Sequence, residues 1–148
     1  MSVTTAYLYK KFGDPHAERN LGLVYIPEDL IAANPKLPKR IYLNKDLHAP
    51  LLKALRNCQA AGVLGEITSF DGAFNIRTVR GGVSTSKHSW AYAVDFNAAD
   101  NRMGYTQMQL LQMGLRPFSE KFLACFRAAG FTCGGDWIYR PDRMHFEM

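Results

Sequence analysis

The chain lacks any hydrophobic run that could cross a membrane, since a crossing needs about 18 consecutive apolar residues and no run in the 148 residues approaches that length. Its first residues also lack the basic and then apolar order of a signal peptide. We therefore expect the protein to be synthesised in a cytoplasm and not to insert into a membrane. Hydrophobic residues make up 47% and charged residues 21% of the chain, a balance typical of a globular domain with its own core.

Cysteine is scarce and shows no pairing pattern. Cys58, Cys125 and Cys133 give an odd count without a CxxC pair. This excludes a disulfide framework and a cysteine zinc knuckle, and we expect three free, mostly buried thiols in a reducing compartment. The sequence leaves open whether Cys133 is an inert core thiol or touches a functional site.

Common catalytic and nucleic-acid-binding motifs are absent as well. There is no HExxH, no GxSxG and no P-loop, so the helical zinc-protease pattern and the serine nucleophile elbow are excluded. The net charge is +5, which suits either a basic soluble surface or attraction to a polyanion. Basic residues are scattered except for Lys36, Lys39 and Arg40, and we expect no nucleic-acid partner.

The order of the expected elements indicates the fold class. The length suits one domain over residues 1–148, and residues 1–46, rich in proline and turn residues, should form an irregular wrap with a short helix near residues 28–33. Helices and strands then mix without regular alternation, which predicts an α+β fold with a small antiparallel sheet and flanking helices. The other expected elements are helices near 49–61, 106–114 and 119–129, and strands near 66–70, 92–96, 138–139 and 144–148.

Two short segments far apart in the sequence hold the candidate chemistry: SKHSWAYAVD, which ends at Asp95, and DRMHFE, which begins at Asp142. They offer the imidazoles of His88 and His145, the carboxylate of Asp95, and a spare carboxylate three residues before the last histidine. A catalytic zinc site needs three protein ligands and one free acid, because its fourth position must stay open to water. We therefore predict a zinc site if the two segments meet in space.

Strand geometry gives the residues of the first segment different positions. Side chains alternate along a strand, so Ala91, Ala93 and Asp95 should share a face of small residues while their bulkier neighbours pack on the core. His88 lies seven residues before Asp95, an odd separation, and should therefore lie on the turn that enters the strand.

The second segment follows the same alternation. His145 and Glu147 should share one face, and Glu147 could either orient His145 or be a surface charge. Asp142 should project from a turn near His145 and act as a general base. A lone histidine is more often structural than a ligand, and only the conjunction of both histidines with nearby carboxylates favours a site.

The two segments resemble the signatures of a known family. The first is similar to the SxHxxGxAxD signature of the D-alanyl-D-alanine carboxypeptidase and dipeptidase family of zinc peptidases (peptidase family M15). The second is similar to the other signature of that family, an acidic residue followed after two residues by a histidine. An Asp as the acid, with a Phe-x-x-Arg stretch and a Gly-rich loop upstream, resembles the L-alanyl-D-glutamate endopeptidases used as phage endolysins. The family has Gly where this chain has Ala91, which would strain an alanine if the position needs a positive φ.

The resemblance implies roles for the candidate ligands and the acid. His88, Asp95 and His145 would bind zinc. Asp142 would take a proton from the attacking water and pass it to the leaving amine. The implied fold is the small α+β fold shared with the Hedgehog signalling domain.

The resemblance also implies supporting residues. Arg77 would stabilise the oxyanion or bind a carboxylate, with Arg80 as the alternative. Ser86 would support the site by hydrogen bonding. Trp90 and Trp137 flank the ligand segments, and for each the sequence leaves open core packing or substrate contact.

The function implied by the resemblance is that of a zinc-dependent peptidoglycan peptidase, most specifically an endolysin that cleaves the L-Ala–D-Glu bond of the stem peptide. Two alternatives stay open: a D,D-carboxypeptidase or dipeptidase of the same family, and a non-catalytic zinc-containing wall-binding module. We expect a monomer without a separate wall-binding domain. It would be made in the host bacterial cytoplasm and reach the wall through a membrane pore or after lysis.

Overall fold

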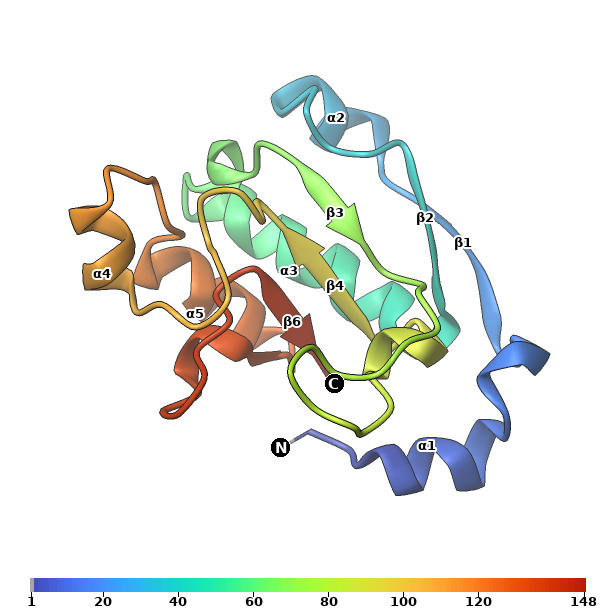
Figure 1. Ribbon diagram of the computed structural model, residues 1–148. Helices are drawn as coiled ribbons and strands as arrows, with labels where there is room; N and C mark the ends of the chain where they lie inside the picture. Colours follow the sequence, from blue (N-terminus) through green and yellow to red (C-terminus); the bar gives the residue numbers. More distant parts are fainter. Residues whose placement is uncertain (1) are drawn as a thin grey trace.

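The computed structural model describes residues 2–148 and has an α+β architecture (Figure 1). Its main sheet is antiparallel with the strand order β3-β4-β6-β5, and a separate two-stranded sheet lies beside it. The predicted fold class, with a small antiparallel sheet and flanking helices, is confirmed, and the second sheet is an addition to it. The main strands are β3 (Phe70–Gly72), β4 (Ala93–Phe96), β6 (His145–Glu147) and β5 (Thr132–Cys133).

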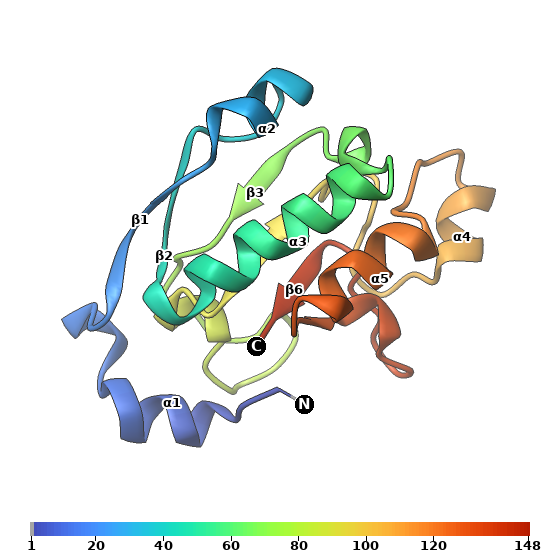
Figure 2. The same ribbon diagram turned by 180° about the vertical axis from the view of Figure 1, so that it is seen from behind.

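Two helices cover one face of the main sheet, α3 (His48–Ala60) and α5 (Glu120–Ala128) (Figure 2). Helix α5 begins where Ser119 Oγ accepts a hydrogen bond from the backbone N–H of Phe122, the capping interaction expected from the sequence. The apolar stripe of α5 packs on β6, since the Phe126 ring lies 4.3 Å from that of Phe146. Both helices were predicted from their periodicity, and both are confirmed.

The first 46 residues are more regular than the sequence indicates. The prediction of an irregular wrap is wrong for the described part of this segment, although its short helix is confirmed. Strands β1 and β2 pair antiparallel, and prolines fall between the elements or cap them instead of interrupting them. The elements are α1 (Thr5–Phe12), β1 (Leu21–Tyr25), α2 (Glu28–Ala33) and β2 (Arg40–Asn44).

Two further strand predictions are wrong. The backbone N–H groups of Thr68 and Ser69 donate to Asn97 Oδ1 rather than to a neighbouring strand, so β3 begins later, at Phe70. Ile138 and Tyr139 form no strand and lie in an exposed turn, with 88% and 98% of their surfaces accessible. The two-residue strand β5 was missed, because so short a segment has no periodicity of its own.

The remaining helix and the cysteines follow expectation. Helix α4 (Gln107–Gln112) begins at the capping residue Thr106. All three cysteines are free and buried. Cys133 Sγ donates to the Leu123 carbonyl, and burial raises the pKa of its thiol to about 12, so it is a core thiol. Among residues 2–148, no helix has the length and apolar character required to cross a membrane.

Candidate metal centre

Strands β4 and β6 bring the two distant segments together. Asp95 lies directly opposite His145 in their antiparallel pairing, so the two side chains project from the same face of the sheet. The alternate residues Val94 and Phe146 point to the other face and are fully buried in the core. The predicted alternation is therefore confirmed within β4 and β6, but the placement of Ala91 on the same strand face is wrong, because this residue precedes β4 and has a left-handed conformation.

His88 approaches this pair from the 3₁₀ turn η4 (Lys87–Trp90), as its odd separation from Asp95 predicts. Ser86 caps the turn, since its Oγ accepts a hydrogen bond from the His88 backbone N–H at 3.2 Å. The turn ends at Ala91, which is left-handed at φ 50° and ψ 39°. The family glycine therefore corresponds to a position of positive φ, and this chain strains an alanine there.

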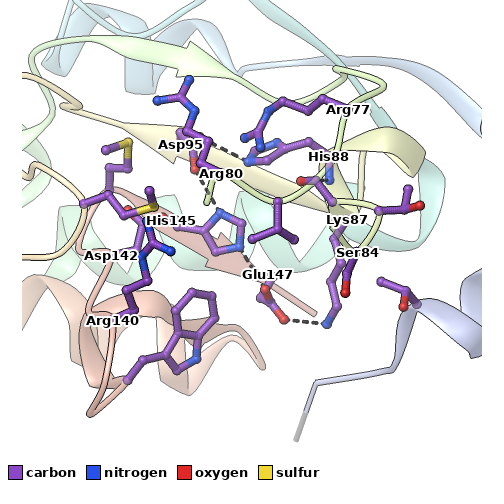
Figure 3. A pocket seen from close by; sticks show the side chains of 17 residues that line it. Arg77, Arg80, Ser84, Lys87, His88, Asp95, Arg140, Asp142, His145 and Glu147 are labelled. Carbon is purple, nitrogen blue, oxygen red and sulfur yellow. Dashed lines mark hydrogen bonds and ion pairs between the residues drawn. The ribbon is translucent and has the colours of Figure 1, made fainter. Parts of the chain in front are cut away.

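The ligand-type atoms of His88, Asp95 and His145 all lie within 4.8 Å of one another (Figure 3). His88 Nδ1 lies 2.8 Å from the Ala73 carbonyl, which only accepts, so Nδ1 holds the hydrogen. Its Nε2 is buried 3.1 Å from Asp95 Oδ2 and has no hydrogen-bond partner in the described part of the chain. A lone pair that faces a carboxylate needs a cation between them, and two nitrogens with one oxygen are a donor set suited to zinc.

Buried charges of opposite sign shift the pKa values of this group. Burial alone would raise the pKa of Asp95, but the hydrogen bond with His145 and the nearby imidazole of His88 outweigh burial and hold this pKa well below its usual range. Burial would lower the pKa of His145, yet its hydrogen bonds with Asp95 and Glu147 raise it to about 9. The carboxylates thus stabilise positive charge between them, which favours a divalent cation.

Asp142 lies on the turn that leads into β6. Its backbone N–H donates to the Gly134 carbonyl at 2.8 Å, and its own carbonyl accepts from the His145 N–H at 3.1 Å. The side-chain Oδ1 is buried and has no hydrogen-bond partner among residues 2–148. Burial and the charge of Asp95, opposed by the charge of His145, raise the pKa of Asp142 to about 6. A carboxyl with such a pKa suits proton transfer near neutrality.

One cavity of about 370 Å³ contains the whole candidate site. The structure therefore brings together the predicted ligands, the predicted acid and the predicted supporting residues, while the chemical roles of these residues remain predictions. Among the residues that line the cavity are Arg77, Arg80, Ser86, His88, Asp95, Trp137, Asp142 and His145.

The sequence left open whether each tryptophan packs in the core or faces the cavity, and the structure places the two differently. Trp90 is 2% exposed and its Nε1 donates to the Gly13 carbonyl, so it belongs to the core. Trp137 is 39% exposed, lines the cavity, and has its ring 5.4 Å from that of His145. Glu147 is buried and hydrogen-bonded to His145, so the alternative of a surface charge is wrong.

Sequence reasoning missed two cationic residues of the cavity, Lys87 and Arg140. Lys87 directly precedes His88, and this adjacency was the available signal. Arg140 was hidden by the wrong strand prediction over residues 138–139. Its guanidinium lies against Gly81 from the opposite loop, a contact between distant segments that no local pattern reveals.

A buried His-Asp-His group beside a free acid, in a cavity on a small α+β sheet, defines a candidate metal centre of the metallopeptidase kind. Residues 80–148, slightly less than half of the chain, match the family model described as D-alanyl-D-alanine carboxypeptidase. The matched part includes the three candidate ligands and Asp142, whereas Arg77 lies outside it. The match supports the predicted resemblance to peptidase family M15 and, together with the candidate metal site, a peptidoglycan peptidase in general.

Comparison with curated proteins and with solved structures gave no match. The fold shared with the Hedgehog domain and the resemblance to the phage endolysin subgroup therefore remain predictions from the sequence.

Proposed function

We propose that the protein is a zinc-dependent peptidoglycan peptidase, and specifically an endolysin that cleaves the L-Ala–D-Glu bond of the stem peptide. The observation that supports this most is the shared cavity of three ligand-type side chains and one buried, unpartnered acid. An Asp as that acid, rather than Glu, favours the endopeptidase subgroup. We further propose that it acts as a monomer and reaches the wall from the host cytoplasm through a membrane pore or after lysis.

The proposed mechanism assigns the proton transfers to Asp142. Zinc bound by His88, Asp95 and His145 would supply Lewis acidity at the scissile carbonyl and lower the pKa of water there. Asp142 would accept the proton of the attacking water and return it to the leaving nitrogen. Its Oδ1 has no hydrogen-bond partner among the described residues, so this oxygen is available for the transfer.

Arginines supply positive charge around the cavity. Arg77, Arg80 and Arg140 all line it, and within residues 2–148 none of the three forms an ion pair with a carboxylate. One well-placed donor to a developing oxyanion contributes about 3 kcal/mol to catalysis. A peptide that contains D-glutamate is anionic, so an arginine that does not contact the oxyanion would bind the substrate carboxylate.

The variant Asp142→Asn tests the catalytic role of this residue. We expect the rate of wall lysis to fall about 10²- to 10⁴-fold while zinc content and melting temperature are retained. The matched control is Asp136→Asn, which alters an exposed carboxylate paired with Arg127 outside the cavity. Full lysis by Asp142→Asn would contradict the catalytic role of Asp142, whereas wild-type protein that binds the wall without lysing it would favour the wall-binding module.

The cleaved bond is identified by mass spectrometry of digested muropeptides. Cleavage of L-Ala–D-Glu creates a new N-terminal D-glutamate, which no other cut of the stem peptide produces. Release of terminal D-alanine, without new N-terminal D-glutamate, would instead identify a D,D-carboxypeptidase. Purified protein without stoichiometric zinc would contradict the metal-dependent mechanism itself.

A further inference from the structure

An ion pair connects the two elements that hold the histidines. Lys87 directly precedes His88 on η4, and Glu147 follows His145 by two residues on β6. Their side chains pair with each other and are only 10% and 11% exposed. The pair is marked in Figure 3. Lys87 Nζ also donates to the carbonyl of Met148, the residue after β6, at 2.9 Å, so the lysine contacts the end of the chain at two points.

Glu147 determines which nitrogen of His145 faces the centre. Glu147 Oε1 lies 2.9 Å from His145 Nε2. A carboxylate only accepts, so Nε2 holds a hydrogen and Nδ1 is directed at Asp95 Oδ1, 3.1 Å away. His88 has the opposite arrangement, because its Nδ1 donates to the Ala73 carbonyl and its Nε2 faces the centre.

The two histidines thus depend on different partners. The partner of His88 is a backbone carbonyl, which the fold fixes. The partner of His145 is a flexible side chain, which needs its own restraint. Glu147 is almost fully buried, and its carboxylate contacts both His145 and the Lys87 ammonium. Without Lys87, a second carboxylate would be buried beside Asp95 with no cation of its own.

We propose that Glu147 and Lys87 are positioning residues of the metal centre. Glu147 orients His145 with Nδ1 toward the zinc, and Lys87 holds Glu147 in place across the two elements. The inference rests on the proposed function, since it assumes that the centre binds zinc. Hydrogen-bonding partners behind a metal ligand typically contribute about 10- to 100-fold to metal affinity.

The first test is the zinc dissociation constant, measured by competition with a chelator of known affinity. We expect Glu147→Ala and Lys87→Met to bind zinc about 10- to 100-fold more weakly than wild type. The double variant should lose no more zinc affinity than the single variant with the larger loss, because both residues act on the same histidine. Lys11→Met is the matched control, because Lys11 pairs with Asp46 outside the cavity. Wild-type affinity in both single variants would overturn the proposal.

The second test is nitrogen-15 NMR of the imidazoles in the zinc-loaded protein. Wild type should show His145 with a protonated Nε2 and a metal-bound Nδ1. Glu147→Gln keeps an acceptor for Nε2–H and should retain this signature, whereas Glu147→Ala should lose it. An unchanged signature in Glu147→Ala would overturn the positioning role, even if its melting temperature falls.

The outcomes separate this inference from the proposed function. Wild type without zinc overturns the proposed metal centre and the inference with it. Wild type with zinc, beside variants of unchanged affinity and signature, overturns only the roles of Lys87 and Glu147. If Glu147→Ala does not fold, the zinc affinity of Lys87→Met decides the matter, because methionine keeps the side-chain volume, and wild-type affinity in that variant would overturn the proposal.

Discussion

Asp95 and Asp142 are two carboxylates of one cavity whose surroundings shift their pKa values in opposite directions. Asp95 lies between two imidazoles, and its pKa is held well below the usual range. Asp142 is buried without a donor, and its pKa is raised to about 6. A carboxylate that stays ionised suits a ligand, and one that takes up a proton near neutrality suits an acid-base role.

The pKa of Asp142 predicts the acid side of the pH profile. A raised pKa means that the proton is retained up to higher pH, and the proposed base must be ionised. Activity should therefore fall as the pH drops through about 6, or somewhat lower with zinc bound, because the cation favours the carboxylate. The measurement is kcat/KM against pH, with zinc content followed at each pH. Activity that stays constant to pH 4, or falls only in step with zinc loss, would contradict the prediction.

Gly134 fixes the backbone that presents Asp142. A Cβ at Gly134 would lie 3.1 Å from Asp142 Cβ and against its carbonyl oxygen, so the turn must shift. We expect Gly134→Ala to cost about 1–3 kcal/mol in unfolding free energy and to lower kcat about 10- to 100-fold, as small misplacements of reacting groups do.

The control for this variant is Gly65→Ala. A Cβ there meets no atom within 4 Å and the residue has no positive φ. Its unfolding free energy in urea should stay within about 0.5 kcal/mol of wild type. Equal effects of the two substitutions would show that the contact with Asp142 is irrelevant.

At the scale of elements, the junction between η4 and β4 depends on Ala91. The residue is fully buried and left-handed, so the backbone conformation and the available space both restrict it. Ala91→Gly removes the strain but also a buried methyl group, and its unfolding free energy should change by no more than about 1 kcal/mol.

Ala91→Val should be far more damaging. A β-branched residue is strained in the left-handed region and its extra volume has no room, so we expect a loss of about 3 kcal/mol or more. Urea denaturation of both variants measures the difference. A valine variant as stable as the glycine variant would show that the junction relaxes to an extended conformation.

At the scale of the whole molecule, zinc should couple η4, β4 and β6, because each contributes one ligand. Free zinc at 1,000 times its dissociation constant stabilises the folded state by about 4 kcal/mol, and a chain of this size then melts about 8–16 °C higher. Melting curves with and without a chelator measure this shift. His88→Ala should lose most of the shift, and a wild type insensitive to chelation would contradict it.

Local patterns predicted much of this architecture. Helices α3 and α5 follow from apolar periodicity and capping, and the faces of Asp95 and His145 follow from strand alternation. The N-terminal strands and the late start of β3 did not follow, because pairing partners and the hydrogen bonds of Asn97 come from elsewhere in the chain. The turn at residues 138–139 was mistaken for a strand because two apolar residues there remain exposed.

The sequence by itself determined the fold class, the family resemblance and the candidate ligands, since residue types and spacings along one segment are local properties. Only the tertiary structure decided that Asp95 faces His145, that Ala91 needs a positive φ, and that Glu147 pairs with Lys87. The pairs of Asp95 with His145 and of Lys87 with Glu147 are contacts between residues about 50–60 positions apart. The packing of β4 against β6 sets such contacts, and no spacing within one segment contains them.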